Sequence, residues 1–224
     1  MVCINKCSCL KKRIYLFEEK NLFDKGLLMM ATPKVAYNYD KEAYMHGYCQ
    51  YFAFEAQKIY GGKICLWLDL DEMSGTERLC HAFLEIAPGF CLDAYGVFSN
   101  LDERMEEFEY NYINVVSCTH KEAEEVLKRI KLKYTDSTLK KNAREYLRNN
   151  RLFMRVRHSN GSIYPFTFSA RTDAFGKDRI IVNTYNEKEK KSSSLAHTLS
   201  VEEILNGLVE KPYMIEDINW DYRI

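Results

Sequence analysis

The sequence predicts an α+β fold in which a helix packs against an antiparallel sheet and a further β-rich region follows. Three observations lead to this prediction. Apolar residues recur at helical spacing over residues 49–60, strand-like runs follow over residues 63–95, and alternating apolar and polar residues return after residue 150. We therefore expect two regions: an α+β core with a helical lobe at 1–150, and a β-meander with a short helix at 151–224.

The helix at 49–60 is predicted from its apolar face and from its end. Four apolar residues recur at the spacing of one helix face: Phe52, Ala53, Ala56 and Ile59. The pair Gly61-Gly62 then acts as a stop signal. Cys49 falls in the first turn, where unpaired backbone N–H groups and the positive end of the helix dipole favour a thiolate. Because only the thiolate attacks an electrophile, this position suits a nucleophile.

Strands are predicted directly after this helix. The runs at 63–70 and 79–86 are rich in apolar and aromatic residues, and Pro88-Gly89 marks a hairpin turn into a returning strand at 90–95. A period of two puts alternate residues on one face of the second run: Leu79, His81, Phe83 and Glu85. If Asp93 pairs with His81 across the hairpin, or lies diagonal to it, its carboxylate orients the imidazole.

Cys49, His81 and Asp93 are therefore the candidate catalytic residues. A histidine held by a carboxylate on one ring nitrogen keeps the other nitrogen available to take the proton of the cysteine. This is the arrangement of nucleophile, base and orienting carboxylate found in triads.

These residues resemble the papain-like and transglutaminase-like cysteine enzyme superfamily. The strings GYCQYFAFEA, HAFLEI and FCLDAYG are similar to its cysteine helix, histidine strand and aspartate strand. The separations, 32 residues from Cys49 to His81 and 12 from there to Asp93, fit compact transglutaminase-like members better than papain. The resemblance covers residues 46–95 and implies a cysteine-dependent hydrolase or acyl-transfer enzyme without a cofactor. Its substrate is a protein or peptide amide: peptide or isopeptide cleavage comes first, and glutamine deamidation or transamidation second.

One element of the papain pattern is absent, which is the glutamine a few residues before the cysteine. The oxyanion of the reaction then needs the backbone N–H of Cys49 and a second donor. Gln50, His46 and Tyr44 are the candidates for this donor or for substrate contact.

Other interpretations remain open for the same residues. Free cysteines usually pack in cores, and a non-catalytic protein-binding module, an inhibitor or an effector, is the alternative function. A metal site from Cys49, Cys80, His81 and Asp93 is disfavoured, because neighbouring strand residues point to opposite faces and no Cys-x-x-Cys pair is present. His158 or His197 is an alternative base.

Composition excludes several classes of partner. The net charge is zero, with 32 basic and 32 acidic residues, so nucleic acid is not an expected partner. We expect no membrane span, because no apolar run reaches 18 residues. Eight cysteines without a secretory signal indicate a reducing compartment, and we expect a cytoplasmic location. Cys3, Cys7 and Cys9 precede a basic run, and are either incidental or part of a metal site or membrane tether.

The rest of the chain predicts further elements. Helices are expected after Thr119 and Ser200, each three residues before a glutamate in a capping box, and a third helix begins at Asp136 or Ser137. An acidic helix is expected over 101–110, with Asn100 and Glu103 as cap and partner. Strands are expected at 152–159, 162–170 and 179–185, with Asn160-Gly161 as a hairpin turn. Residues 186–194 are expected to form a polar loop, and Arg151, Arg155 and Arg157 an exposed strand face for an acidic partner.

Overall fold

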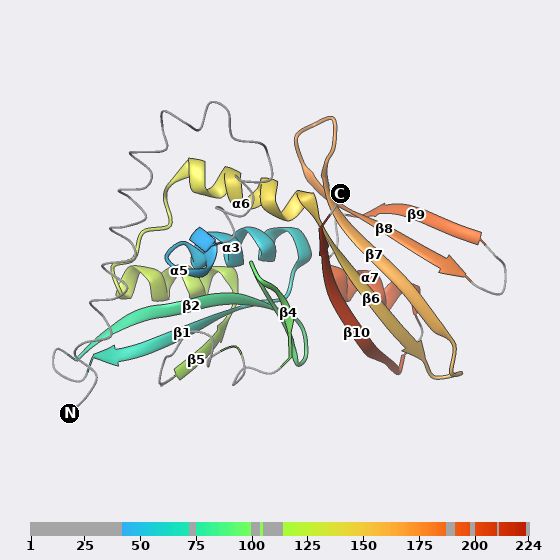
Figure 1. Cartoon of the computed structure of the whole chain (residues 1–224), viewed down its shortest axis with the longest axis horizontal. Coiled ribbons are helices and arrows are strands. Elements are labelled where there is room, and N and C mark those ends of the chain that lie inside the picture. The colour runs from blue at the N-terminus through green and yellow to red at the C-terminus, as the bar shows by residue number, and fades with distance from the viewer. Residues whose placement is uncertain are drawn as a thin grey trace.

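The computed structural model describes residues 42–71, 75–99, 104, 114–186, 191–197, 200–209 and 211–222 (Figure 1). Two antiparallel sheets of five strands each organise this part of the chain, and helices pack against them. The α+β class predicted from the sequence is therefore confirmed. The helices are α3 (Cys49–Tyr60), α5 (His120–Arg129), α6 (Ser137–Asn149) and α7 (Val201–Leu208).

The first sheet has the strand order β4-β3-β2-β1-β5. Its strands are β1 (Lys63–Asp71), β2 (Thr76–Ala87), β3 (Phe90–Asp93), β4 (Gly96–Phe98) and β5 (Asn114–Cys118). Helices α3 and α5 share an apolar cluster with β1, in which Phe54 and Leu127 pack with Leu66. Both helices therefore cover the same face of this sheet.

The second sheet has the strand order β10-β6-β7-β8-β9. Its strands are β6 (Asn150–His158), β7 (Ile163–Thr172), β8 (Asp178–Asn186), β9 (Lys191–His197) and β10 (Tyr213–Tyr222). The alternation expected in β6 is confirmed, since Leu152, Met154 and Val156 are fully buried while Arg155 is exposed. The other two arginines are half-buried, and Arg157 pairs with Glu216.

Two strands of the second sheet were not predicted from the sequence. Lys191–His197 lies largely within the expected polar loop, yet it forms the edge strand β9 along β8. The aromatic tail after Lys211 forms β10, which pairs with β6 over its whole length. Both strands form because a partner strand offers backbone hydrogen bonds, which local composition does not reveal. The predicted helix over 101–110 and the N-terminal cysteines lie outside the described residues, except for Arg104.

Helix α3 is the centre of the molecule. Ten of its 12 residues are buried, including Gln50 and Glu55, although the sequence predicts only one buried face. The reason is that the first sheet covers one side of α3 and the second sheet with α6 covers another. Gly61 ends the helix with a φ of 74°, and a Cβ there would lie 2.3 Å from the Cβ of Ser200, just before α7.

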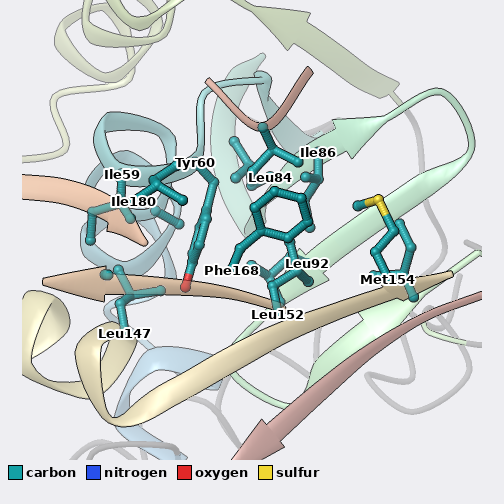
Figure 2. Packing of buried hydrophobic residues seen from close by; sticks show 14 of the residues in the cluster. Ile59, Tyr60, Leu84, Ile86, Leu92, Leu147, Leu152, Met154, Phe168 and Ile180 are labelled. Carbon is teal, nitrogen blue, oxygen red and sulfur yellow. The ribbon is translucent and has the colours of Figure 1, made fainter. Parts of the chain in front are cut away.

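A single hydrophobic cluster joins the two regions. Figure 2 shows Tyr60 of α3 and Leu84 and Leu92 of the first sheet packed with Leu152 and Phe168 of the second. The change of composition near residue 150 coincides with the junction of α6 and β6. The C-terminal region adds a separate sheet, but its apolar face packs against α3 and the first sheet.

Candidate active site

The three predicted catalytic residues come from three elements that meet at one end of α3. Cys49 is the first residue of α3, His81 lies in β2, and Asp93 is the last residue of β3. Their exposed fractions are 5%, 0% and 1%. The structure thus brings together side chains that are up to 44 residues apart in the sequence, from Cys49 to Asp93, and buries all three.

His81 and Asp93 are in direct contact. Nε2 of the imidazole lies 3.3 Å from Oδ2 of the carboxylate. The pairing of β2 with β3 includes Leu84 opposite Leu92, so Asp93 continues one residue farther and His81 lies diagonal to it. The diagonal arrangement anticipated from the hairpin is therefore the one that forms, and a diagonal neighbour is within reach of long or aromatic side chains.

A β-bulge sets the position of His81. Trp67 pairs with His81, whereas the next residue, Leu68, pairs with Leu79, so Cys80 is an extra residue in β2. Strict alternation consequently fails here: Leu79 packs with the cluster under α3, and Cys80 with the cluster on the opposite face. The sequence prediction that Leu79 and Phe83 share one face is wrong for this reason.

Aromatic side chains surround the imidazole. The Trp67 ring lies 5.7 Å from it and the Phe83 ring 6.1 Å from it, the latter stacked at 25°. These rings exclude water from the histidine and fix its plane. The imidazole is therefore held in one orientation.

Cys49 and Asp93 both act on the pKa of His81. Burial lowers the pKa of His81. Hydrogen-bonding and charge interactions with Asp93 and Cys49 raise it by more, and the resulting pKa is about 9. Asp93 contacts Nε2, and the other ring nitrogen, Nδ1, is buried. With a pKa of about 9 the imidazole is protonated at neutral pH, which is the form needed in a thiolate–imidazolium pair.

The Asp93 carboxylate is held from several sides. Its Oδ1 accepts hydrogen bonds from the backbone N–H groups of Tyr95, at 2.8 Å, and Gly96, at 3.2 Å. Arg104 forms an ion pair with it, with 3.0 Å between Nε and Oδ2. Sequence reasoning missed Arg104, because it treated the acidic run around this residue as a solvated helix face. The one available signal was a single cation among many acidic residues.

The three oxyanion candidates lie in different surroundings. Gln50 is buried next to the nucleophile, with the Cys49 Sγ 3.9 Å from its Oε1. His46 is 39% exposed and pairs with Glu42 at 3.4 Å. Tyr44 is a core residue instead: its ring packs between Phe52 and Tyr146, and its hydroxyl donates to the Leu139 carbonyl. The prediction for Tyr44 is therefore corrected, because its polar atom is directed at α6.

Three further described thiols, Cys65, Cys91 and Cys118, have raised pKa values. Burial raises the pKa of Cys65 to about 11 and that of Cys91 to about 12. Burial also raises the pKa of Cys118, which lies in the same apolar cluster as Cys49. These thiols are protonated near neutral pH, so they serve as internal references for Cys49.

The alternative sites of the sequence analysis do not converge on Cys49. His158 lies beside the β6–β7 turn and His197 ends β9. Within the described ranges, no group of three or more histidine, cysteine, aspartate or glutamate side chains is arranged to hold a metal ion. In the same part of the chain, no helix is long and apolar enough to cross a membrane.

Two cavities lie away from the triad. One, of about 480 Å³, is on the second sheet and is lined by Arg151, Phe153, Thr167, Asn219 and Trp220. The other, of about 430 Å³, lies between the β2–β3 turn, α7 and the start of β10. Neither of these two cavities is lined by Cys49, His81 or Asp93.

Comparison of the chain with protein-family models, with curated proteins and with solved structures found no match. Inference about function therefore rests on the geometry of the residues themselves.

Proposed function

We propose that the protein is a cysteine-dependent hydrolase or acyl-transfer enzyme that acts on a protein or peptide amide through Cys49, His81 and Asp93. The observation that carries this proposal is the His81 imidazole, which contacts a fixed carboxylate and whose pKa is raised by that carboxylate and by the thiol at the start of α3. An imidazole has two ring nitrogens that each seek a partner when buried. The groups that act on this ring are a potential nucleophile and a carboxylate able to orient a base.

The chemistry follows from this arrangement. The Cys49 thiolate attacks the carbonyl carbon of the amide, and the carbonyl oxygen takes the electron pair as an oxyanion. The backbone N–H of Cys49, which at the first helical position has no acceptor within the helix, is one donor for that oxyanion. Gln50 supplies the other when its amide turns over and presents Nε2 in place of Oε1.

His81 moves the protons in both halves of the reaction. Its imidazolium donates a proton to the leaving amine, the C–N bond breaks, and a thioester forms on Cys49. The neutral imidazole then removes a proton from water, or from an amine in acyl transfer, and the oxygen or nitrogen attacks the thioester. Cys49 leaves as a thiolate beside a reprotonated His81, so the starting state is restored.

The resemblance to papain-like and transglutaminase-like enzymes supports the same proposal. Their order of cysteine helix, histidine strand and aspartate strand is the order of α3, β2 and β3 here. We propose peptide or isopeptide hydrolysis first and glutamine deamidation or transamidation second. A cytoplasmic location belongs to the same proposal, since the chemistry requires a reduced thiol.

The test is turnover of amide substrates by the full chain. A peptide library reports cleavage by mass spectrometry, and a glutamine-containing protein with a primary amine reports ammonia release and amine incorporation. Wild type and Cys118→Ala are expected to turn over one of these substrates, whereas Cys49→Ala and His81→Ala are not. Equal activity in wild type and Cys49→Ala contradicts the proposal.

The second candidate is a protein-binding module with a degenerate cysteine-protease-like fold. It is favoured by one specific observation, the burial of all three triad residues away from both cavities. In that case Cys49 reacts no faster than Cys118, and Cys49→Ala leaves every activity of the protein unchanged. The same set of variants therefore separates the two candidates.

A further inference from the structure

Arg104 contacts both oxygens of the Asp93 carboxylate. Its Nε lies 3.0 Å from Oδ2, and its Nη2 donates to Oδ1 at 3.3 Å. The arginine side chain is only 10% exposed. Its guanidinium lies over the rings of Phe98, at 4.7 Å, and Tyr95, at 5.7 Å. Two-point contact and stacking fix a planar guanidinium far better than they would fix an ammonium group.

From this geometry we infer that Arg104 is a positioning residue of the proposed triad: it holds the Asp93 carboxylate in its contact with His81, and its charge weakens the pull of that carboxylate on the His81 proton. The inference rests on the proposed function for its catalytic meaning. The effect of the Arg104 charge on the pKa of His81 does not depend on that function.

Charge balance is the first argument. The proposed resting state has a thiolate on Cys49, an imidazolium on His81, a carboxylate on Asp93 and a guanidinium on Arg104. The signs alternate along the row, and the set is neutral. Without Arg104 the same buried set carries a net negative charge, which low-dielectric surroundings disfavour strongly.

The second argument is that His81 and Arg104 contact the same oxygen of Asp93. Oδ1 of Asp93 accepts from the N–H groups of Tyr95 and Gly96, whereas Oδ2 contacts both His81 and Arg104. A cation on Oδ2 withdraws negative charge from the imidazole on the same atom. It therefore reduces the proton affinity of His81, which has to release its proton in each cycle.

Several side chains of the described residues lie around His81. Cys49 comes from α3 and Asp93 from β3, with Arg104 behind the carboxylate. From β1 the facing side chain is Trp67, which does not titrate. The neighbouring thiols Cys65 and Cys91 have raised pKa values and are neutral near pH 7. Removal of Arg104 thus takes away the cation behind the Asp93 carboxylate.

The experiment is an NMR titration of His81 in the full chain labelled with ¹⁵N-histidine, with the signal assigned through His81→Gln. Arg104→Met removes the cation and keeps an apolar side chain between Phe98 and Tyr95, and we expect it to raise the pKa of His81 by about 1. Arg104→Lys keeps the charge, so the pKa of His81 stays close to its wild-type value. An unchanged or lowered pKa in Arg104→Met, or an equal rise in Arg104→Lys, overturns the inference.

A second measurement applies if Arg104→Met does not fold. Asp93→Asn leaves the Arg104 guanidinium without its counter-ion, and breaking a buried pair is more costly than removing both partners. We expect the double variant Asp93→Asn/Arg104→Met to melt at a higher temperature than Asp93→Asn alone. A lower melting temperature of the double variant overturns the charge coupling.

The two proposals fail separately. If Cys49 is unreactive but Arg104→Met raises the pKa of His81, the electrostatic role of Arg104 stands and the catalytic function falls. If Cys49 is reactive and the pKa of His81 does not respond to Arg104, the function stands and the role of Arg104 falls.

Discussion

Helix α3 carries two buried charged networks, and they differ in kind. The first, at its start, joins Cys49 to His81, Asp93 and Arg104. The second, in its middle, centres on the Glu55 carboxylate, which is 1% exposed. Tyr134 donates to Glu55, and Lys58 and Arg144, both about two-fifths exposed, form ion pairs with it.

The second network has the features of a structural clasp. Burial raises the pKa of Glu55, but hydrogen bonds from Tyr134, Lys58 and Arg144 lower it by more. The carboxylate is therefore ionised and satisfied, and it ties α3 to α6 and to the segment between α5 and α6. The first network contains a thiol and a protonated base, which a clasp does not need. Burial of charge alone does not indicate a site; the type of the buried groups does.

The largest expected difference between the networks is in thiol reactivity. His81→Ala removes the group that assists the thiolate, so alkylation of Cys49 by iodoacetamide at pH 7 should slow by about 100-fold or more. His120→Ala is the matched control, because His120 bonds to Gln57 beside the second network. Peptide mapping by mass spectrometry gives the rate at each cysteine. A His81→Ala protein that labels as fast as wild type rules His81 out as the base.

The free energy of unfolding should depend more strongly on the second network than on the first. Glu55→Ala removes the buried carboxylate and leaves Lys58 and Arg144, which are about two-fifths exposed, so we expect it to lower the free energy of unfolding by about 1.5 kcal/mol. Glu145→Ala removes an exposed partner of Lys141 on α6 and should change that free energy by no more than about 0.5 kcal/mol. Urea denaturation measures both. Similar values for the two variants would show that Glu55 is not a clasp.

The contributions of the two networks to stability should change with pH in opposite directions. The pKa of His81 is raised from 6.5 to about 9 in the folded chain, so its stabilisation is fully present below pH 6.5 and is lost as the pH rises through 9. The pKa of Glu55 is lowered, so its stabilisation is present above its unfolded value of 4.5 and is lost as the pH falls. Differences in unfolding free energy between wild type and His81→Gln or Glu55→Gln, measured from pH 4 to 9.5, check both signs. A His81 contribution that grows toward pH 9 contradicts the raised pKa.

Much of the fold was predictable because its signals are local. The bounds of α3 match the prediction. Its apolar residues recur at helical spacing, and the pair Gly61-Gly62 directly follows its last residue. The capping boxes at Thr119 and Ser200 form as the sequence indicates. These features depend on side chains three or four residues apart, and such contacts can be read from the chain directly.

The features that sequence reasoning missed depend on distant partners. Strand β9 is polar because it is an edge strand, and only its pairing with β8 defines it. The bulge at Cys80 changes which face each side chain takes, and a periodic pattern cannot reveal an inserted residue. Arg104 acquires its role through an ion pair with Asp93, on a different element. The three residues of the proposed triad were identifiable because their chemistry and spacing are unusual. The residues that position them were not identifiable from the sequence.

The most direct test of the proposed triad is the ratio of the alkylation rates of Cys49 and Cys118 in the wild-type protein at pH 7. The two thiols are 5% and 4% exposed and share one apolar cluster, so access is matched and the difference reports the imidazole. We predict that Cys49 reacts about 100-fold faster than Cys118, and that the excess disappears in His81→Ala. Equal rates at the two cysteines would contradict a catalytic thiol and leave the protein-binding module as the better description.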